Sequence, residues 1–129
     1  ALGMGYGLPR LKALGIQPTE IRLTGGGGNS PVWRQIMADV FQAGVVCTTQ
    51  IESAALGAAI QAAWTWHSQE GRRASITDIT DAWVGLDEST RRGPRSGNRI
   101  VYEEMQDCHN TLSRCLREVF ARHRRLLAP

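Results

Sequence analysis

The chain has 129 residues and a mass of 14.2 kDa, which allows one compact domain and excludes two of ordinary size. Apolar residues make up 42% of it and charged residues 21%, an ordinary globular composition that excludes disorder as the overall state. No apolar stretch approaches the ~20 residues of a membrane-spanning helix, and a net charge of +3 is too small to indicate a nucleic-acid or membrane partner.

The first predicted element is a helix over residues 3–14, followed by a stop at Gly15. Three glycines and Pro9 make this helix weak on its own. Its apolar side chains have helical spacing and are Met4, Leu8, Leu11 and Leu14. We expect it to be the last turns of a longer helix, because the chain begins at Ala1 without an initiator methionine.

A short strand is predicted over 21–24, where apolar and polar residues alternate, and four glycines follow it. Ser30 and Pro31 then provide a helix N-cap and a proline at the first helical position. The predicted helix over 31–42 has one apolar face, made of Trp33, Ile36, Met37, Val40 and Phe41. We place Asp39 on its polar face and its end at Gly44, and we predict a second strand over 45–49.

A second helix is predicted from Glu52 to about His67. Its many alanines leave almost no polar face, which is typical of a helix buried on all sides. Gly57 lowers the helix propensity by about 1 kcal/mol relative to alanine, so we expect a neighbouring segment to pass close to it.

The polar residues 68–98 are predicted to form mostly surface loop, with at most a short helix over 76–83. A last, long helix is predicted over 98–125. Apolar and thiol side chains recur along it at intervals of 4, 3, 4, 3 and 4, at Val101, Met105, Cys108, Leu112, Cys115 and Val119. We expect this helix to pack back along its own domain.

The order of helices and strands predicts an α/β fold. Its elements run strand, glycine loop, helix, strand and helix, with the long helix at the C-terminus. Two strands do not make a stable sheet on their own, so we expect them to extend a sheet whose other strands are absent or few.

Three cysteines, Cys47, Cys108 and Cys115, cannot all pair within one chain. An odd, low number favours a reducing, cytoplasmic setting with buried, reduced thiols. Cys108, His109 and Cys115 lack the closely spaced ligand pairs of a zinc site, so we predict no metal.

The C-terminal tail carries five arginines and one glutamate over residues 114–125. One hypothesis is an autonomous interaction module that binds nucleic acid or protein through this helix, with an affinity that falls steeply with salt. A solvated face of an amphipathic helix explains the pattern better, because no aromatic loop that could contact bases accompanies it.

The glycine loop, residues 24–31, is the segment with chemical content. A strand that passes through glycines into a helix N-terminus brings unpaired backbone N–H groups together and lets a phosphate or nucleobase approach closely. No lysine follows, which excludes a P-loop. A small dinucleotide-binding domain is a further hypothesis, but Ser30 stands at the third glycine position and the nearest acid is Glu52.

The stretch IRLTGGGGNSPVWRQIMADVFQAGVVCTTQIESAALGAAIQAAW resembles the C-terminal part of carbohydrate kinases of the FGGY family. The matching features are the strand into the glycines, then Ser-Pro-x-Trp-Arg-Gln, Ala-Asp-x-Phe and Glu-Ser-Ala-Ala-Leu-Gly-Ala-Ala in this order. The resemblance covers most of the chain, is strongest over 21–66 and is poor over 68–98.

The resemblance implies part of an actin-like ATPase (ribonuclease H-like) domain, with ATP bound between two lobes. Residues 1–129 would be the C-terminal part of the nucleotide-binding domain, and the N-terminal sugar-binding lobe would be absent. The implied nucleotide-binding residues are Gly25, Gly26, Gly27, Gly28, Asn29 and Ser30. Gly28 departs from the alanine or serine common at its position, and Glu52 and Gly57 match a helix whose small face packs beneath the nucleotide.

The resemblance also implies a full-length cytoplasmic enzyme that uses ATP and a ketopentose as substrates and Mg²⁺ as a cofactor. Such an enzyme could form a homodimer. The catalytic aspartate and the Mg²⁺ ligands come from parts that this chain does not match, so we assign no catalytic role to Asp39, Asp78, Asp81 or Asp87. We therefore expect the chain alone to be inactive and to bind neither nucleic acid nor membranes.

Overall fold

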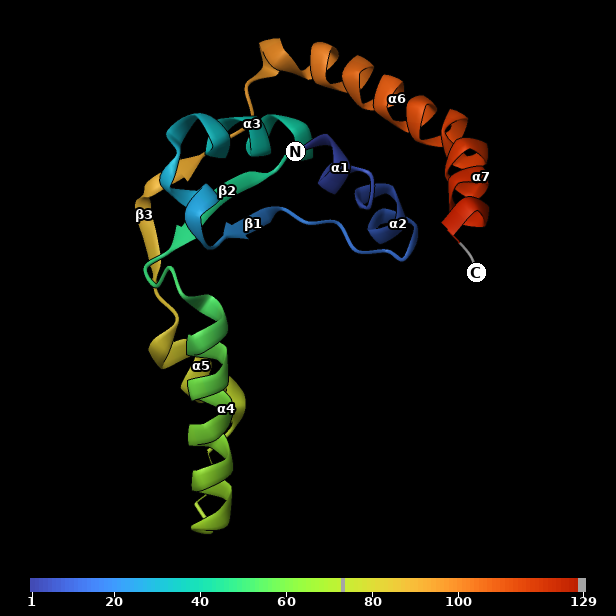
Figure 1. Ribbon diagram of the computed structural model, residues 1–129. Helices are drawn as coiled ribbons and strands as arrows, with labels where there is room; N and C mark the ends of the chain where they lie inside the picture. The colour runs from blue at the N-terminus through green and yellow to red at the C-terminus, as the bar shows by residue number, and fades with distance from the viewer. Residues whose placement is uncertain (73, 128–129) are drawn as a thin grey trace.

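The computed structural model describes residues 1–72 and 74–127 and has the predicted α/β architecture (Figure 1). Its sheet has three strands in the order β1 (Glu20–Leu23), β2 (Gly44–Thr48) and β3 (Leu86–Arg92). β1 and β2 pair in parallel, whereas β2 and β3 pair antiparallel with an irregularity between Val45 and Cys47.

The strand β3 corrects the prediction that residues 68–98 are mostly loop. Its sequence, LDESTRR, is almost entirely polar, and none of its residues is fully buried. Such an edge strand lacks the alternation of apolar and polar residues by which a strand is predicted from a sequence. The short helix predicted in this region is confirmed as α5 (Ile76–Trp83).

The core lies between α3 (Pro31–Phe41) and the sheet. Met37, Ala38 and Val45 are completely buried in it. Partly buried apolar residues surround these three and include Ile21, Leu23, Trp33 and Phe41. The apolar face predicted for this helix is therefore the face that packs on the sheet.

The helix α3 ends one residue earlier than predicted and by a different device. Gln42 adopts a left-handed backbone conformation with φ of 51° and ends the helix. Gly44 has no such role, because it is the first residue of β2. The N-terminal prediction is confirmed, since Ser30 caps α3 and Pro31 is its first residue.

The single helix predicted over 3–14 is in fact two short helices, α1 (Leu2–Gly5) and α2 (Leu8–Ala13). The interruption falls at Tyr6 and Gly7, just before Pro9, whose missing N–H suits the first turn of a new helix. Gly15 has φ of 80° and forms the predicted stop.

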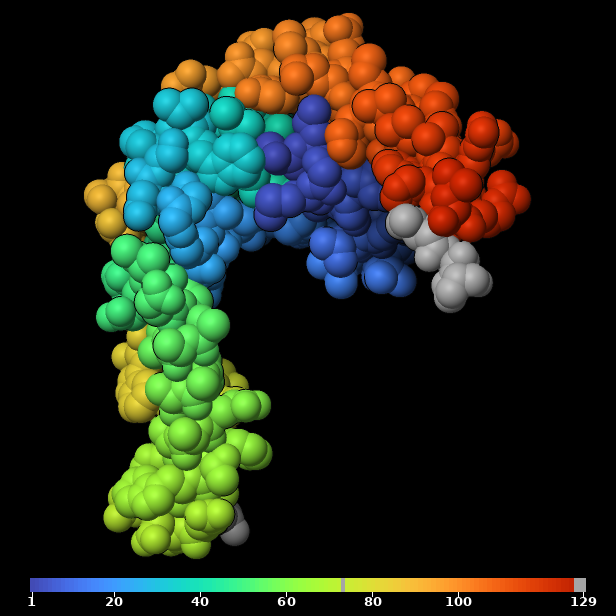
Figure 2. Space-filling view, in the orientation of Figure 1, coloured from blue at the N-terminus to red at the C-terminus, as the bar shows by residue number. Residues whose placement is uncertain are grey.

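The helix α4 (Ser53–Gln69) projects from the sheet and packs along α5 (Figures 1 and 2). The prediction that it is buried on all sides is wrong for this chain, because Ile60 is its only buried residue among those described. The expected close neighbour of Gly57 is also absent among the described residues, since a Cβ added there would meet no atom within 4 Å. An apolar composition shows that a helix can be buried but does not supply the partner.

The long C-terminal helix consists of α6 (Arg99–Cys115) and α7 (Arg117–Leu127), which meet at Leu116 (Figure 1). α6 packs on α1 and α3, but not through the predicted seam. Val101, Met105, Leu112 and Val119 are 46–58% exposed. The face turned to the body carries half-buried polar and aromatic side chains instead, at Tyr102, Gln106, His109 and Asn110.

The predicted burial of all three thiols is only partly right. Cys47 is buried in β2, whereas Cys108 and Cys115 are exposed on α6, and all three are free. Among the described residues, no group of three or more His, Cys, Asp or Glu side chains is arranged to hold a metal ion. None of the helices in the described ranges is both long and apolar enough to cross a membrane.

Asp39 lies in the interior, which corrects its predicted place on a polar face. It is 1% exposed, and its carboxylate accepts hydrogen bonds from Gln35 Nε2 (2.9 Å), the backbone N–H of Arg95 (2.7 Å) and Asn98 Nδ2 (2.7 Å). Asn98 ends the short 3₁₀ helix η2 (Ser96–Asn98) that precedes α6. Asp39 therefore fastens the start of α6 to α3.

Burial by itself raises the pKa of the Asp39 carboxyl, but the bonds from Arg95, Asn98 and Gln35 outweigh it. The pKa of Asp39 lies below its usual value as a result. The carboxylate is thus charged and fully bonded in the folded chain.

Candidate functional site

The glycine turn, residues 24–30, connects the end of β1 to the start of α3. Gly25 has φ of 74° and ψ of −175°, a backbone region that only glycine adopts without strain. Residues Gly26–Asn29 form one 3₁₀ turn, η1. The turn is closed by bonds from Gly28 N to Gly25 O (3.0 Å) and from Ser30 N to Gly27 O (3.3 Å).

The two edges of the turn differ in the space beside their glycines. A Cβ added at Gly25 or Gly26 would meet no described atom within 4 Å. At Gly28 it would lie 3.1 Å from Cys47 Sγ, and at Gly27 it would lie 3.2 Å from Trp33 Nε1. The turn therefore packs on α3 through Gly27 and on β2 through Gly28, and it leaves the space beside Gly25 and Gly26 open to a ligand.

The open edge also carries the free hydrogen-bond donors. A 3₁₀ turn leaves the first N–H groups without a partner inside the turn, here those of Gly26 and Gly27. The N–H of Gly25 is bonded to Ile51 O (3.3 Å), which holds the start of the turn against the segment after β2. A backbone donor at the uncrowded Gly26 and a second at the neighbouring Gly27 suit an anionic or nucleobase ligand.

Ser30 has a structural task in this site. Its Oγ accepts a hydrogen bond from the N–H of Trp33 (3.2 Å), the usual bond of a helix N-cap. Asn29, by contrast, is exposed and lines a cavity of about 550 Å³ beside the turn. The structure thus brings the six predicted site residues together, with Ser30 facing the helix.

Replacing Ser30 by alanine is expected to lower the free energy of unfolding by about 1 kcal/mol, because the N–H of Trp33 loses its partner. Urea unfolding of the two proteins measures the difference. Ser30→Asp restores an acceptor and should recover most of the loss, whereas Ser113→Ala, at an exposed position of α6, should change little. Equal stabilities of the Ser30→Ala and wild-type chains would contradict the capping role.

Arg34 is a site residue that the sequence prediction missed. It is 8% exposed, and its Nη1 donates a 2.5 Å hydrogen bond to the carbonyl of Gly28. The thiol of Cys47 approaches the same oxygen at 3.4 Å. A signal was present in the sequence, because Pro31 has no N–H to offer the carbonyl three residues before it and another donor had to be found.

The strand β3 supports the turn indirectly, because Thr90 binds Cys47, which contacts Gly28. The Oγ1 of Thr90 accepts a hydrogen bond from the N–H of Cys47 (2.9 Å) at the irregularity between β2 and β3. This bond replaces a missing backbone hydrogen bond between β2 and β3. It also holds Cys47, the residue that Gly28 contacts, in place.

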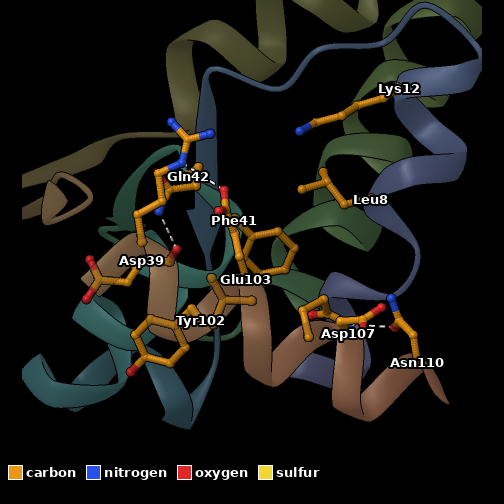
Figure 3. A pocket seen from close by; sticks show the side chains of 12 residues that line it. Leu8, Lys12, Asp39, Phe41, Gln42, Tyr102, Glu103, Asp107 and Asn110 are labelled. Carbon is orange, nitrogen blue, oxygen red and sulfur yellow. Dashed lines mark hydrogen bonds and ion pairs between the residues drawn. The ribbon is translucent and has the colours of Figure 1, made fainter. Parts of the chain in front are cut away.

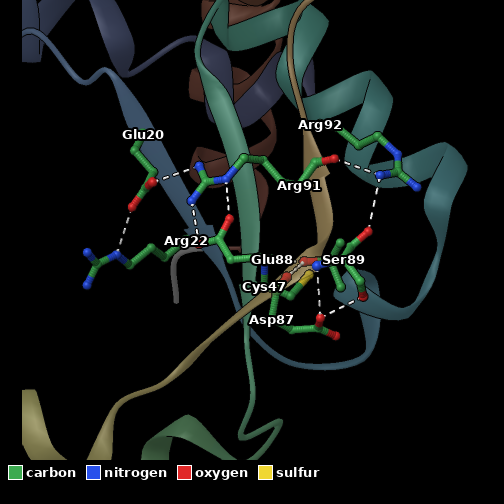
Figure 4. A network of polar contacts seen from close by, with 9 residues as sticks. Glu20, Arg22, Cys47, Asp87, Glu88, Ser89, Arg91 and Arg92 are labelled. Carbon is green, nitrogen blue, oxygen red and sulfur yellow. Dashed lines mark hydrogen bonds and ion pairs between the residues drawn. The ribbon is translucent and has the colours of Figure 1, made fainter.

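A polar network crosses the sheet next to the site (Figure 4). Arg91 of β3 binds Glu88 through two nitrogens (2.5 and 2.7 Å) and reaches Glu20 of β1 at 2.8 Å. The Arg91 guanidinium lowers the pKa of both carboxyls, with Arg22 adding to the effect at Glu20. Because these side chains are in water, the network contributes little to stability.

A second cavity, of about 260 Å³, lies between α2, α3 and α6 (Figure 3). Lys12, Asp39, Tyr102 and Glu103 are among the side chains around it. None of its lining residues belongs to the glycine turn. The open edge of the turn is therefore the better candidate for the functional site.

Comparison with known proteins shows the family of this chain. Residues 1–66 match the model of the C-terminal domain of the FGGY family of carbohydrate kinases, and the chain belongs to this family. The xylulose kinase of Haemophilus influenzae is 40% identical over 106 residues, which are 82% of this chain and 20% of that protein. A gluconokinase of Bacillus licheniformis is 32% identical over 97 residues, which are 75% of this chain and 18% of that protein.

The crystal structure of xylulose kinase from Rhodospirillum rubrum matches with a TM-score of 0.71 and 28% identity, over 93% of this chain and 23% of that one. This match confirms the predicted fold as part of an actin-like ATPase domain. The chain spans about a fifth of the length of the curated relatives it matches.

Proposed function

We propose that this chain is the C-terminal part of the nucleotide-binding domain of an ATP-dependent sugar kinase, with the glycine turn as its contact with the nucleotide. The open edge of the turn at Gly25 and Gly26, with the N–H groups of Gly26 and Gly27 unbonded inside the turn, carries the proposal. Backbone donors on glycine let the phosphates and ribose approach without a side chain in the way. Asn29, which is exposed in the same turn, would lie near the base.

The sugar we propose is D-xylulose, which the kinase would convert with ATP to D-xylulose 5-phosphate and ADP. The support is the higher identity to a xylulose kinase (40%) than to the gluconokinases (32%). Contacts with the sugar, the catalytic base and the clamps on the transferred phosphoryl group would come from a sugar-binding lobe outside these 129 residues.

The chain alone would not catalyse the transfer. Among the described residues no group of three or more His, Cys, Asp or Glu side chains is arranged to hold Mg²⁺, so its ligands would come from other parts of the longer enzyme. The exposed alanine face of α4 and the exposed seam of α6 are the surfaces on which the rest of a longer kinase would pack. The chain would then bind nucleotide weakly and be inactive without its complement.

Complementation tests this function. The chain is fused to the part of the Haemophilus influenzae xylulose kinase that precedes the matched region, and ATP-dependent phosphorylation of D-xylulose is measured. We expect activity in the fusion, none in the isolated chain and none in a fusion that carries Gly25→Val. A folded but inactive fusion, or turnover by the isolated chain, would contradict the proposal.

A further inference from the structure

We propose that Arg34 is a positioning residue for the nucleotide: it fastens the glycine turn to α3 and so aims the N–H groups of Gly26 and Gly27 outward. This inference rests on the proposed function of the turn. It assigns a role to the buried side chain of Arg34, which contacts the turn at the carbonyl of Gly28.

The first support is the hydrogen-bond pattern at the end of the turn. Inside a 3₁₀ turn the carbonyl of Gly28 would accept from the N–H of residue 31, but residue 31 is proline. The guanidinium of Arg34 takes that place with a 2.5 Å bond. Because side chains on a helix point back towards its N-terminus, a residue one turn into α3 reaches this carbonyl. Arg34 therefore completes the turn where the backbone cannot.

The second support is the charge of Arg34. It is buried, and it forms no ion pair with any carboxylate in residues 1–72 and 74–127. Its Nε is likewise buried without a hydrogen-bond partner in the described structure. Removing a guanidinium from water without a counter-ion is costly, and an apolar side chain of similar size would fill the space better. Stability alone therefore does not explain an arginine here.

The third support is the surroundings of the guanidinium. Arg34 lines the cavity of about 550 Å³ together with Gly28 and Asn29 of the turn. Asp87 and Glu88 line it too, but Glu88 is engaged by Arg91 and Asp87 accepts bonds from Ser89. The guanidinium of Arg34 therefore lies against the last residues of the turn, where it favours an anionic ligand, whereas the carboxylate of Asp87 on the same cavity opposes one.

Three variants separate this role from a merely structural one. Arg34→Met keeps the shape but removes both bond and charge, Arg34→Lys keeps the charge without the planar fork, and Arg22→Met removes an exposed arginine of β1 as a control. Calorimetry measures the dissociation constant of ADP well below the unfolding temperature. Amide resonances of Gly26 and Gly27 report the orientation of the turn without ligand.

We expect the dissociation constant to rise about tenfold in Arg34→Met, to lie between Met and wild type in Arg34→Lys, and to stay within about twofold in Arg22→Met. A folded Arg34→Met chain with wild-type affinity and unchanged resonances would overturn the inference. If that variant does not fold, Arg34→Lys decides by the same two readouts. A wild-type chain that binds no ADP contradicts the proposed function instead, and the resonances in Arg34→Met alone then decide whether Arg34 positions the turn.

Discussion

Replacing Gly25 by alanine is expected to abolish most nucleotide binding and to destabilise the chain by about 1–3 kcal/mol. The backbone of Gly25, with φ of 74° and ψ of −175°, lies in a region where a Cβ clashes with its own peptide groups. The surrounding space is open, so the cost comes from the backbone and not from a neighbour. Urea unfolding gives the stability, and ADP calorimetry gives the affinity.

Gly26→Ala is the matched control, because Gly26 has no positive φ and an added Cβ meets no described atom within 4 Å. Its stability should stay the same or rise slightly, since alanine restricts the unfolded chain. Its methyl group stands at the open edge, however, and should weaken ADP binding. If the unfolding curves of Gly25→Ala and wild type coincide, residue 25 does not require the backbone conformation that only glycine adopts without strain.

Replacing Asp39 by alanine is expected to lower the free energy of unfolding by about 3 kcal/mol, the second large effect. The change leaves the N–H of Arg95 and the amide of Asn98 without their acceptor at a partly buried site, while Gln35 Nε2 keeps its bond to Gly93 O (3.0 Å). Urea unfolding measures the loss. Asp107→Ala, at an exposed position of α6, should change stability by less than about 0.5 kcal/mol. A similar small change at Asp39 would contradict its role as the clamp between α3 and α6.

Asp39 also gives the chain a pH dependence with a definite sign. The pKa of Asp39 is lower in the folded chain than in the unfolded chain. Its contribution to the free energy of unfolding is therefore complete above the unfolded pKa, about 3.9, and is lost as the pH falls through the folded pKa. The wild-type chain should therefore lose its advantage over Asp39→Asn as the pH falls below about 4. Unfolding free energies at several pH values test this, and an advantage that grows towards acid would refute it.

The sequence was most informative where structure is set by neighbours along the chain. The glycine turn, the cap at Ser30 and the stop at Gly15 are each determined by a few consecutive residues, and all three are present. The candidate site was predicted on the same basis, because a strand, glycines and a helix N-terminus in succession place donors together.

The rest depends on partners distant in the chain. Asp39 is hydrogen-bonded to residues 56 and 59 positions away, so nothing near it predicted its burial. β3 owes its place to pairing with β2 and to Thr90, not to its own polar sequence. The alanines of α4 predicted burial, but burial needs a second surface, and α5 covers only one side.

A titration of the isotopically labelled chain with ADP tests whether the open edge of the glycine turn binds the nucleotide. We predict that the amide resonances of Gly25–Asn29 shift with a common dissociation constant, while those of α7 stay in place. Shifts confined to the arginine-rich α7, or no shift in the turn at millimolar ADP, would contradict the account.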